Sequence, residues 1–295
     1  MQVVLAGASG LIGTALGESL RADGHRVKAL VRRAPAGEDE DSWDPANGRL
    51  DPDFLSDADA VVCLSGAPVD GHRWNEEYKQ QILASRVDSV GTVARTLAEY
   101  GGPPVLVCAS AVGYYGDTGD QTVDEDAPPG ESFLSRVCVQ WEQAAQPARD
   151  AGVRVTHLRT GLPLTGTGGL LKRLKPIVQT GVAGRLGSGR QFMPWISFPD
   201  EIAAIRFLIQ HELPGPVNLT GPVPVRNAEF MSTLGRVLRR PTVLPTPAFA
   251  IKIALGELAG EALAGQRAVP KRLIEAGFAF AHPNLESAMR AALGR

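Results

Sequence analysis

The chain has few of the residues that mark secreted, metal-binding or membrane-spanning proteins. Its three cysteines, Cys63, Cys108 and Cys138, are too few for a disulfide framework and lack metal-ligand spacing. Two of them, Cys63 and Cys108, fall inside apolar runs, where free thiols are commonly buried. We therefore expect a reducing, cytoplasmic environment and no bound metal.

Long apolar runs are also missing. A bilayer-spanning helix needs roughly 20 predominantly apolar residues. The closest stretch is 248–265, AFAIKIALGELAGEALAG, which Lys252, Glu257 and Glu261 interrupt. We predict an ordinary helix there, and the first residues show no secretory signal pattern.

An excess of either charge is absent too. Lys and Arg total 30 and Asp and Glu total 32, which gives a formal net charge of −2. This balance provides no electrostatic footprint for nucleic acid or for an anionic membrane. We expect neither as a partner.

What the chain does contain is typical of a globular protein with many turns. Hydrophobic residues make up 44% and charged residues 21%, and the 33 glycines and 22 prolines are not periodic. Short apolar runs of Val, Leu, Ile and Ala predict buried parallel strands at Val3–Ala6, Val27–Val31, Ala60–Leu64, Val105–Ala109 and Val153–Leu158.

Helical patterns lie between these runs, at Leu11–Ala22, about 75–100 and about 132–151. The alternation predicts an α/β fold with a Rossmann-type, doubly wound parallel sheet. We expect three segments: a dinucleotide-binding domain at 1–160, an interleaved substrate-side segment at 161–240 and a small helical extension at 241–295. In the second segment we expect a helix at 201–211, a strand at Val217–Thr220 and a helix at 226–240.

A glycine loop follows the first predicted strand and opens the first helix. It reads Gly7-Ala8-Ser9-Gly10-Leu11-Ile12-Gly13. Glycines let the backbone turn tightly and let a diphosphate approach main-chain N–H groups at a helix N-terminus. In this context we predict a dinucleotide site that uses Gly7, Ser9, Gly10, Leu11, Ile12 and Gly13.

The second predicted strand ends in Arg32-Arg33 rather than in an acidic residue. An Asp or Glu at this place takes the ribose 2′-hydroxyl of NAD, whereas an Arg accommodates the 2′-phosphate of NADP. We therefore predict NADP(H). The acidic residues at 38–41 come later and are expected in a loop, and a pair of solvated arginines is the alternative interpretation.

From here the chain resembles the extended short-chain dehydrogenase/reductase superfamily, in particular an atypical epimerase-family branch with a small C-terminal extension. The matching motifs run in order along nearly the whole chain. They include GASGLIGTAL at 7–16, LSGAPV at 64–69, SRV at 85–87, SAVGYYG at 110–116, VCVQWE at 137–142, LRTGLPL at 158–164, GSGRQFMPWI at 187–196 and GQRAVPKRLIEAGFAF at 265–280.

The resemblance implies further cofactor contacts from Leu64, Ser65 and Gly66 after the third strand, and from Gln81, Arg86 and Arg159. The alternatives are a surface salt bridge for Arg86 and a structural contact for Arg159. The resemblance also implies substrate contact from Arg190 or Trp195. The alternative is that both belong to a buried structural loop. Asp124-Glu125-Asp126 is expected to be a solvated loop or a cap.

The Tyr-x-x-x-Lys pair of ordinary short-chain dehydrogenases is missing from the chain. Anchored on Trp141-Glu142, its two positions hold Leu134 and Cys138, and neither replaces that chemistry. Ser110, which follows the fourth strand, and Tyr114 and Tyr115 in the next loop are the candidate catalytic residues. Packing or a turn hydrogen bond is the alternative for Tyr115.

Three functions follow. The first is an NADP(H)-dependent oxidoreductase acting on an unknown small carbonyl or hydroxyl compound. The second is a noncatalytic NADP(H)-binding sensor or regulator, which the missing pair favours. The third is a sugar-nucleotide epimerase. A homodimer through the helix at 75–100 is left open, since an apolar helix face usually packs within its own chain.

Overall fold

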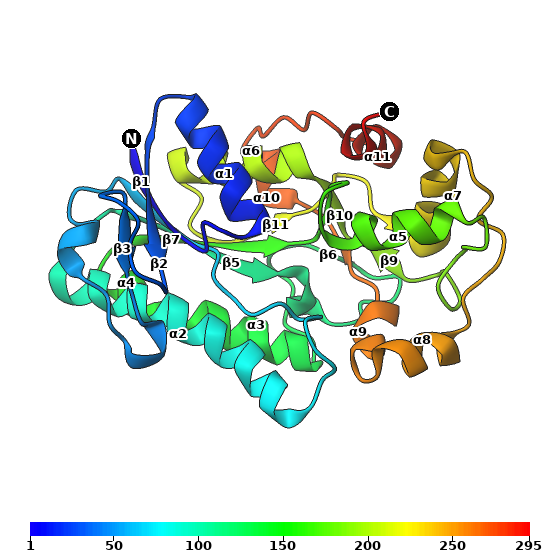
Figure 1. Cartoon of the computed structure of the whole chain (residues 1–295), viewed down its shortest axis with the longest axis horizontal. Coiled ribbons are helices and arrows are strands. Elements are labelled where there is room, and N and C mark those ends of the chain that lie inside the picture. Colours follow the sequence, from blue (N-terminus) through cyan, green and yellow to red (C-terminus); the bar gives the residue numbers. More distant parts are fainter. The chain divides into compact units, whose positions relative to one another are not determined.

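A seven-stranded sheet with flanking helices organises the computed structural model, which describes residues 1–295 (Figure 1). The strand order is β11-β7-β5-β4-β1-β2-β3. Pairing is parallel between β1 and each of β2 and β4, between β2 and β3, and between β4 and β5. The strands are β1 (Gln2–Ala6), β2 (Arg26–Val31), β3 (Glu40–Ser42), β4 (Ala60–Cys63), β5 (Val105–Ala111), β7 (Arg154–Thr160) and β11 (Gly215–Leu219). The predicted Rossmann-type sheet is confirmed.

Burial explains which strands could be predicted from the sequence. Every residue of β4 is fully buried, and so are Val3, Val4 and Ala6 of β1, because the strands are covered on both faces. Each of the six predicted strands overlaps an observed one. The strand β3 was missed because its residues, Glu40-Asp41-Ser42, are polar and lie at the edge of the sheet.

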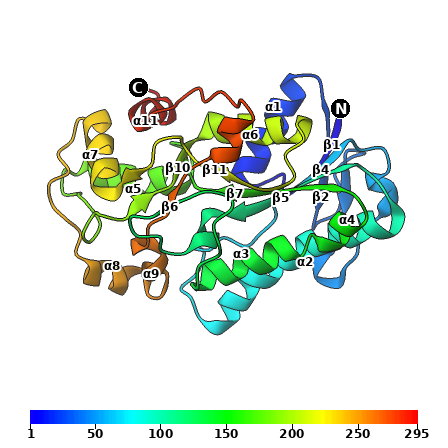
Figure 2. The same ribbon diagram turned by 180° about the vertical axis from the view of Figure 1, so that it is seen from behind.

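Helices cover both faces of the sheet. Figures 1 and 2 show α1 on one face and α2 and α4 on the other. The helices associated with the sheet are α1 (Leu11–Ala22), α2 (Glu76–Tyr100), α3 (Phe133–Gln143), α4 (Gln146–Asp150) and α6 (Phe198–Gln210), with short 3-10 turns η1 (Pro45–Asn47), η2 (Pro52–Leu55) and η3 (Val112–Tyr115). The predicted helix at about 132–151 is in fact two, since α3 ends at Gln143 and α4 starts again beside Pro147.

The chain forms two compact units that interleave along the sequence. The first unit comprises residues 1–110, 137–158 and 205–216. The second comprises residues 111–136, 159–204 and 217–295. The three segments expected from the sequence remain a prediction.

Short strand pairs and helices build the second unit around a core that includes the fully buried Phe230 and Leu234. Its two-stranded pairings are β10 with β8, β12 with β9 and β13 with β6. The elements are β6 (Thr122–Val123), β8 (Leu162–Leu164), β9 (Phe192–Met193), β10 (Trp195–Ser197), β12 (Val225–Arg226), β13 (Arg267–Ala268), α5 (Gly169–Gln179), α7 (Asn227–Leu238), α8 (Ala248–Leu255), α9 (Leu258–Leu263), α10 (Lys271–Glu275) and α11 (Leu285–Leu293).

The apolar stretch at 248–265 is not the single helix that we predicted. It forms α8 and α9, because the chain turns at Gly256, which has a φ of +61°. No helix anywhere in the chain combines the length and the apolar character that crossing a membrane requires.

Candidate functional site

The glycine loop packs so tightly that two of its positions cannot hold a side chain. Gly7 has a φ of +89°, and a Cβ there would lie 2.9 Å from the carbonyl carbon of Leu64. A Cβ on Gly13 would lie 2.2 Å from the carbonyl oxygen of Gly7. The turn between β1 and α1 therefore depends on both glycines, and it lies against the start of the loop after β4.

The N-terminus of α1 is exposed and has no side-chain cap. Gly10 is the N-cap residue and provides no side-chain acceptor. Ser9, Gly10 and Leu11 are exposed. Because the first N–H groups of a helix have no partner within the helix, they can bind a phosphate here with the help of the helix dipole.

The two arginines after β2 differ in their partners. Arg33 forms a bidentate ion pair with Glu40, at 2.7 and 2.6 Å. Hydrogen bonds from Arg33 and from the Ala36 N–H lower the pKa of Glu40 to about 2. Arg32 is exposed and has no partner within the protein. Glu40 therefore lies in a strand rather than in the expected loop. It forms its ion pair with Arg33 and not with Arg32.

Ser85 and Arg86 on α2 hold the loop that follows β4. The Ser85 hydroxyl accepts a hydrogen bond from the Ala67 N–H at 2.9 Å, and Arg86 Nη1 donates to the Ala67 carbonyl at 3.0 Å. Gly66 packs against the Arg86 side chain, and Arg86 lies 5.0 Å from the Trp141 ring. Burial lowers the pKa of Arg86. Arg86 therefore does not form the surface salt bridge that was its alternative role. Gln81, on the same helix, is exposed.

Ser110 is buried beside a carboxylate. Its side chain is 3% exposed, and its hydroxyl donates to Glu142 Oε1 at 2.7 Å. Glu142 is itself buried on α3. No sequence pattern indicated this pair, because 32 positions separate the two residues. The proton of Ser110 is already engaged, and a catalytic role for this residue stays a prediction.

Tyr115 belongs to a buried polar cluster in the second unit. Its hydroxyl donates to Asn218 Oδ1 at 2.7 Å and accepts from Arg159 Nη1 at 3.0 Å. Burial raises the pKa of Tyr115 to about 12, although Arg159 works against that rise. These hydrogen bonds fit the alternative of a structural role for Tyr115, and its catalytic role stays a prediction.

The adjacent Tyr114 is placed differently. It is half-buried, and the Arg159 guanidinium lies 3.5 Å from the centre of its ring. The structure thus brings together three predicted residues, Tyr114, Tyr115 and Arg159. Arg159 is 3% exposed, and it also donates to the Glu125 carbonyl at 3.2 Å.

Glu125 corrects the expectation of a solvated acidic loop. It is 4% exposed, and its Oε1 accepts from the backbone N–H groups of Asn218 and Arg272. Burial raises its pKa. Asp124 and Asp126 on either side form ion pairs with Lys271. The run of three acids therefore ties two distant segments of the second unit together.

Arg190 and Trp195 have different surroundings. Arg190 is exposed and approaches Asp120 at 3.9 Å. Trp195 is 1% exposed, and its indole N–H donates to the Val223 carbonyl at 3.1 Å. Contact of either residue with a substrate stays a prediction.

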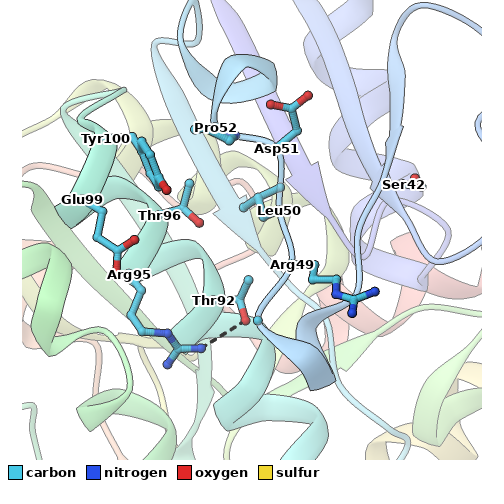
Figure 3. A pocket seen from close by; sticks show the side chains of 11 residues that line it. Ser42, Arg49, Leu50, Asp51, Pro52, Thr92, Arg95, Thr96, Glu99 and Tyr100 are labelled. Atoms are coloured by element: carbon cyan, nitrogen blue, oxygen red, sulfur yellow. Dashed lines mark hydrogen bonds between the residues drawn. The ribbon is translucent and has the colours of Figure 1, made fainter.

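A pocket of about 400 Å³ lies elsewhere in the first unit, between the last turns of α2 and residues 48–52. Figure 3 shows Thr96 and Tyr100 of α2 on one side and Leu50 on the other, with Arg95 hydrogen-bonded to Thr92. Gln81 and Arg86 lie on earlier turns of α2. None of the predicted site residues lines this pocket.

Comparison with known proteins gives matches along almost the whole chain. The model of the NAD dependent epimerase/dehydratase family matches residues 3–220, and that of a domain of unknown function, DUF1731, matches residues 246–292. Epimerase family protein Mb2239 of Mycobacterium bovis is 48% identical over 289 residues, which cover 97% of this chain and 96% of that protein.

Solved structures agree with these matches. Human epimerase family protein SDR39U1, crystallised with NADPH, is similar with a TM-score of 0.91 and 30% identity, and the match covers 100% of both chains. A nucleoside-diphosphate sugar epimerase from Corynebacterium glutamicum gives 0.82 and 33%, and the match covers 100% of this chain and 58% of that one. The resemblance inferred from the motifs is confirmed, and the chain belongs to the NAD dependent epimerase/dehydratase family.

Proposed function

We propose that the protein is an NADP(H)-dependent oxidoreductase of the extended short-chain type, acting on a small carbonyl or hydroxyl compound. The observation that carries the choice of NADP(H) is the state of the two arginines after β2. Arg32 is exposed and unpaired, whereas Glu40, an acid on the neighbouring strand β3, is engaged by Arg33. An unpaired guanidinium at this place suits a 2′-phosphate.

The residues present fit a dinucleotide. Gly7 and Gly13 allow the tight turn, because a Cβ at either would meet the protein's own backbone. The turn leaves the first residues of α1 exposed, where helix N–H groups can meet a diphosphate. Leu64, Ser65 and Gly66, held by Arg86, would border the adenosine side. The bound cofactor would supply or accept the hydride, and the protein would orient the substrate and move one proton.

Tyr114 is the best of the three candidate proton donors. Ser110 already donates to Glu142, and Tyr115 has a raised pKa and a fully engaged hydroxyl. Tyr114 is partly exposed and carries a cation on its ring face. Tyr114, with the Arg159 guanidinium against its ring, would serve in place of the missing Tyr-x-x-x-Lys pair.

The test is a fluorescence titration with NADPH and with NADH. The wild type should prefer NADPH, and Arg32→Ala should lose that preference. Arg33→Ala is the matched control, because it removes an adjacent arginine that already has a partner; it should keep the preference. Equal affinity of the wild type for both cofactors, or no binding of either, would reject the NADP(H) assignment.

A noncatalytic NADP(H) sensor is the second candidate. It is favoured by the engagement of Ser110 and Tyr115, which leaves few groups free for chemistry. A sensor would bind NADPH but consume none with a broad panel of carbonyl compounds. An oxidoreductase would consume NADPH with a fitting compound, and Tyr114→Phe would slow the reaction without weakening NADPH binding.

The cytoplasm is the compartment we propose. The three cysteines are free and buried, and burial raises the pKa of Cys63 to about 12. Such thiols are typical of proteins that fold in a reducing environment.

A further inference from the structure

Exposed apolar side chains are concentrated on one part of the second unit. Of the eleven large hydrophobic residues that the fold leaves exposed, six lie within residues 177–182 and 243–253. Val243 is 76%, Ile253 70% and Phe249 67% exposed. The others of this group are Ile177, Val182 and Leu244.

Backbone contacts make these segments neighbours. Thr246 N–H donates to the Arg185 carbonyl at 2.9 Å, and Gly187 N–H donates to the Thr246 carbonyl at 2.8 Å. Arg240 Nε donates to the Gln179 carbonyl at 3.2 Å. Residues 179–187 and 240–248 therefore run side by side, and Figures 1 and 2 show α5, the connection after α7 and α8 gathered on the same side of this unit.

The helix α8 presents its apolar side chains outward. Ile251 is buried beneath the helix, whereas Phe249 and Ile253, four residues apart, lie together on the opposite face. Lys252 is exposed between them in the sequence. A helix that exposes its apolar face in water leaves that face available to another apolar phase.

The charge on the same segments is of one sign. Residues 166–190 and 230–256 contain nine lysines and arginines and no Asp or Glu, although the whole chain has a net charge of −2. Arg190 and Arg236 approach Asp120 and Glu286. Arg173 also has an interaction partner. The other six, which form no ion pair, are Lys172, Lys175, Arg185, Arg239, Arg240 and Lys252. The first acids beyond α8 are Glu257 and Glu261.

We propose that this basic apolar face, residues 172–187 and 239–253, docks the protein reversibly on an anionic lipid bilayer. Exposed aliphatic and aromatic side chains enter the interfacial region, while the flanking cations meet the lipid phosphates. The near-neutral total charge, which predicted no membrane partner, conceals this separation of charge along the chain.

The same observations argue against other occupants. A second copy of this chain would bring the same unpaired cations against each other in a symmetric contact, which like-charge repulsion opposes. Nucleic acid would use the cations but would leave the exposed side chains of Val243, Leu244 and Phe249 in water. An anionic bilayer satisfies both kinds of side chain.

The experiment is co-sedimentation of the full chain with vesicles at low and high salt. One set contains phosphatidylcholine alone, and the other contains equal parts of phosphatidylcholine and phosphatidylglycerol. The wild type should bind the second set only, and added salt should release it. The double variant Phe249→Glu with Ile253→Glu should bind the vesicles with an affinity lowered at least about tenfold. Val223→Glu, which charges an exposed valine outside the face, is the matched control and should bind as the wild type does.

A charge variant separates a bilayer from a purely electrostatic partner. Lys172→Gln, Lys175→Gln and Arg240→Gln combined should also weaken vesicle binding about tenfold. Circular dichroism must give all variants the wild-type spectrum. The proposal is overturned if the wild type binds neither vesicle set. It is equally overturned if the charge variant loses binding while the Phe249 and Ile253 variant keeps it, since that result indicates a polyanion without an apolar phase.

Discussion

Tyr114 and Tyr115 are neighbours in sequence, but their hydroxyls are in different surroundings. The Tyr115 hydroxyl links Asn218 and Arg159 inside a buried cluster, whereas Tyr114 offers its ring face to the same guanidinium. The motif SAVGYYG made both tyrosines candidates, and nothing in it separates them. The distinction depends on Asn218, 103 positions away, and no sequence pattern indicated it.

The first prediction concerns this cluster. Tyr115→Phe removes the donor to the buried Asn218 Oδ1 and one of the two acceptors of Arg159 Nη1, which keeps its hydrogen bond to the Glu125 carbonyl. The cost is about 1–3 kcal/mol in the free energy of unfolding. Tyr114→Phe is the matched control, because it keeps the ring beneath Arg159 and should cost less than about 0.5 kcal/mol. Chemical denaturation measures both, and equal losses would contradict the assignment of Tyr115 as the structural phenol.

At the scale of elements, the turn between β1 and α1 was the most predictable part of the site. Its glycine spacing, its strand and the bounds of α1, Leu11–Ala22, were all legible in the sequence. The reason is local, since the chain must turn, approach its own backbone and start a helix within seven residues. The hydrogen bonds of Ser85 and Arg86 to Ala67 depend on tertiary packing, and the motif SRV marked only the positions.

The second prediction uses that turn. In Gly13→Ala, the new Cβ would meet the Gly7 carbonyl oxygen at 2.2 Å, so the backbone of the loop must move. We expect a loss of about 1–3 kcal/mol of stability and at least a tenfold loss of NADPH affinity. Denaturation and a fluorescence titration measure these effects.

Gly260→Ala is the control for that substitution. Gly260 also lies inside a helix, α9, but a Cβ there meets nothing within 4 Å. Alanine should therefore leave NADPH binding unchanged and stabilise the helix by about 0.5–1 kcal/mol. A loss of binding in Gly260→Ala similar to that in Gly13→Ala would show that the close approach at Gly13 is not the cause.

At the scale of the whole molecule, the sequence predicted the sheet better than the assembly of the chain. The strands were legible because each is a short buried apolar run. The interleaving of the two units was not, because segments such as 111–136 return to residues more than 80 positions later, as Glu125 does to Asn218. Glu125 looked like part of a solvated acidic run because its burial depends on those returning segments.

Stability against pH is a further property of the whole molecule that such buried acids control. Glu201 is fully buried at the start of α6, with only Thr160 donating to it at 3.0 Å, and burial raises its pKa to about 8. Burial also raises the pKa of Glu125. Acids with exposed ion pairs, Glu40 and Glu286, have lowered pKa values instead. Solvent screening makes these exposed contributions small.

The third prediction follows from the sign of these shifts. Between pH 4.5 and about 8, folded Glu201 keeps a proton that the unfolded chain releases. The free energy of unfolding therefore falls as the pH rises through this window, by at most about 1.4 kcal/mol per pH unit from this residue, and the contribution levels off above it. Glu40 and Glu286, whose pKa values are lowered, act in the opposite direction and only below their unfolded pKa values, so maximal stability lies near the acidic end of the window.

Denaturation at several pH values measures this effect. Glu201→Gln should have a flatter profile of unfolding free energy against pH, because glutamine still accepts from Thr160 and does not ionise. The exposed control Glu18→Gln should follow the wild type. An unchanged slope in Glu201→Gln would mean that Glu201 is ionised in the folded protein at neutral pH.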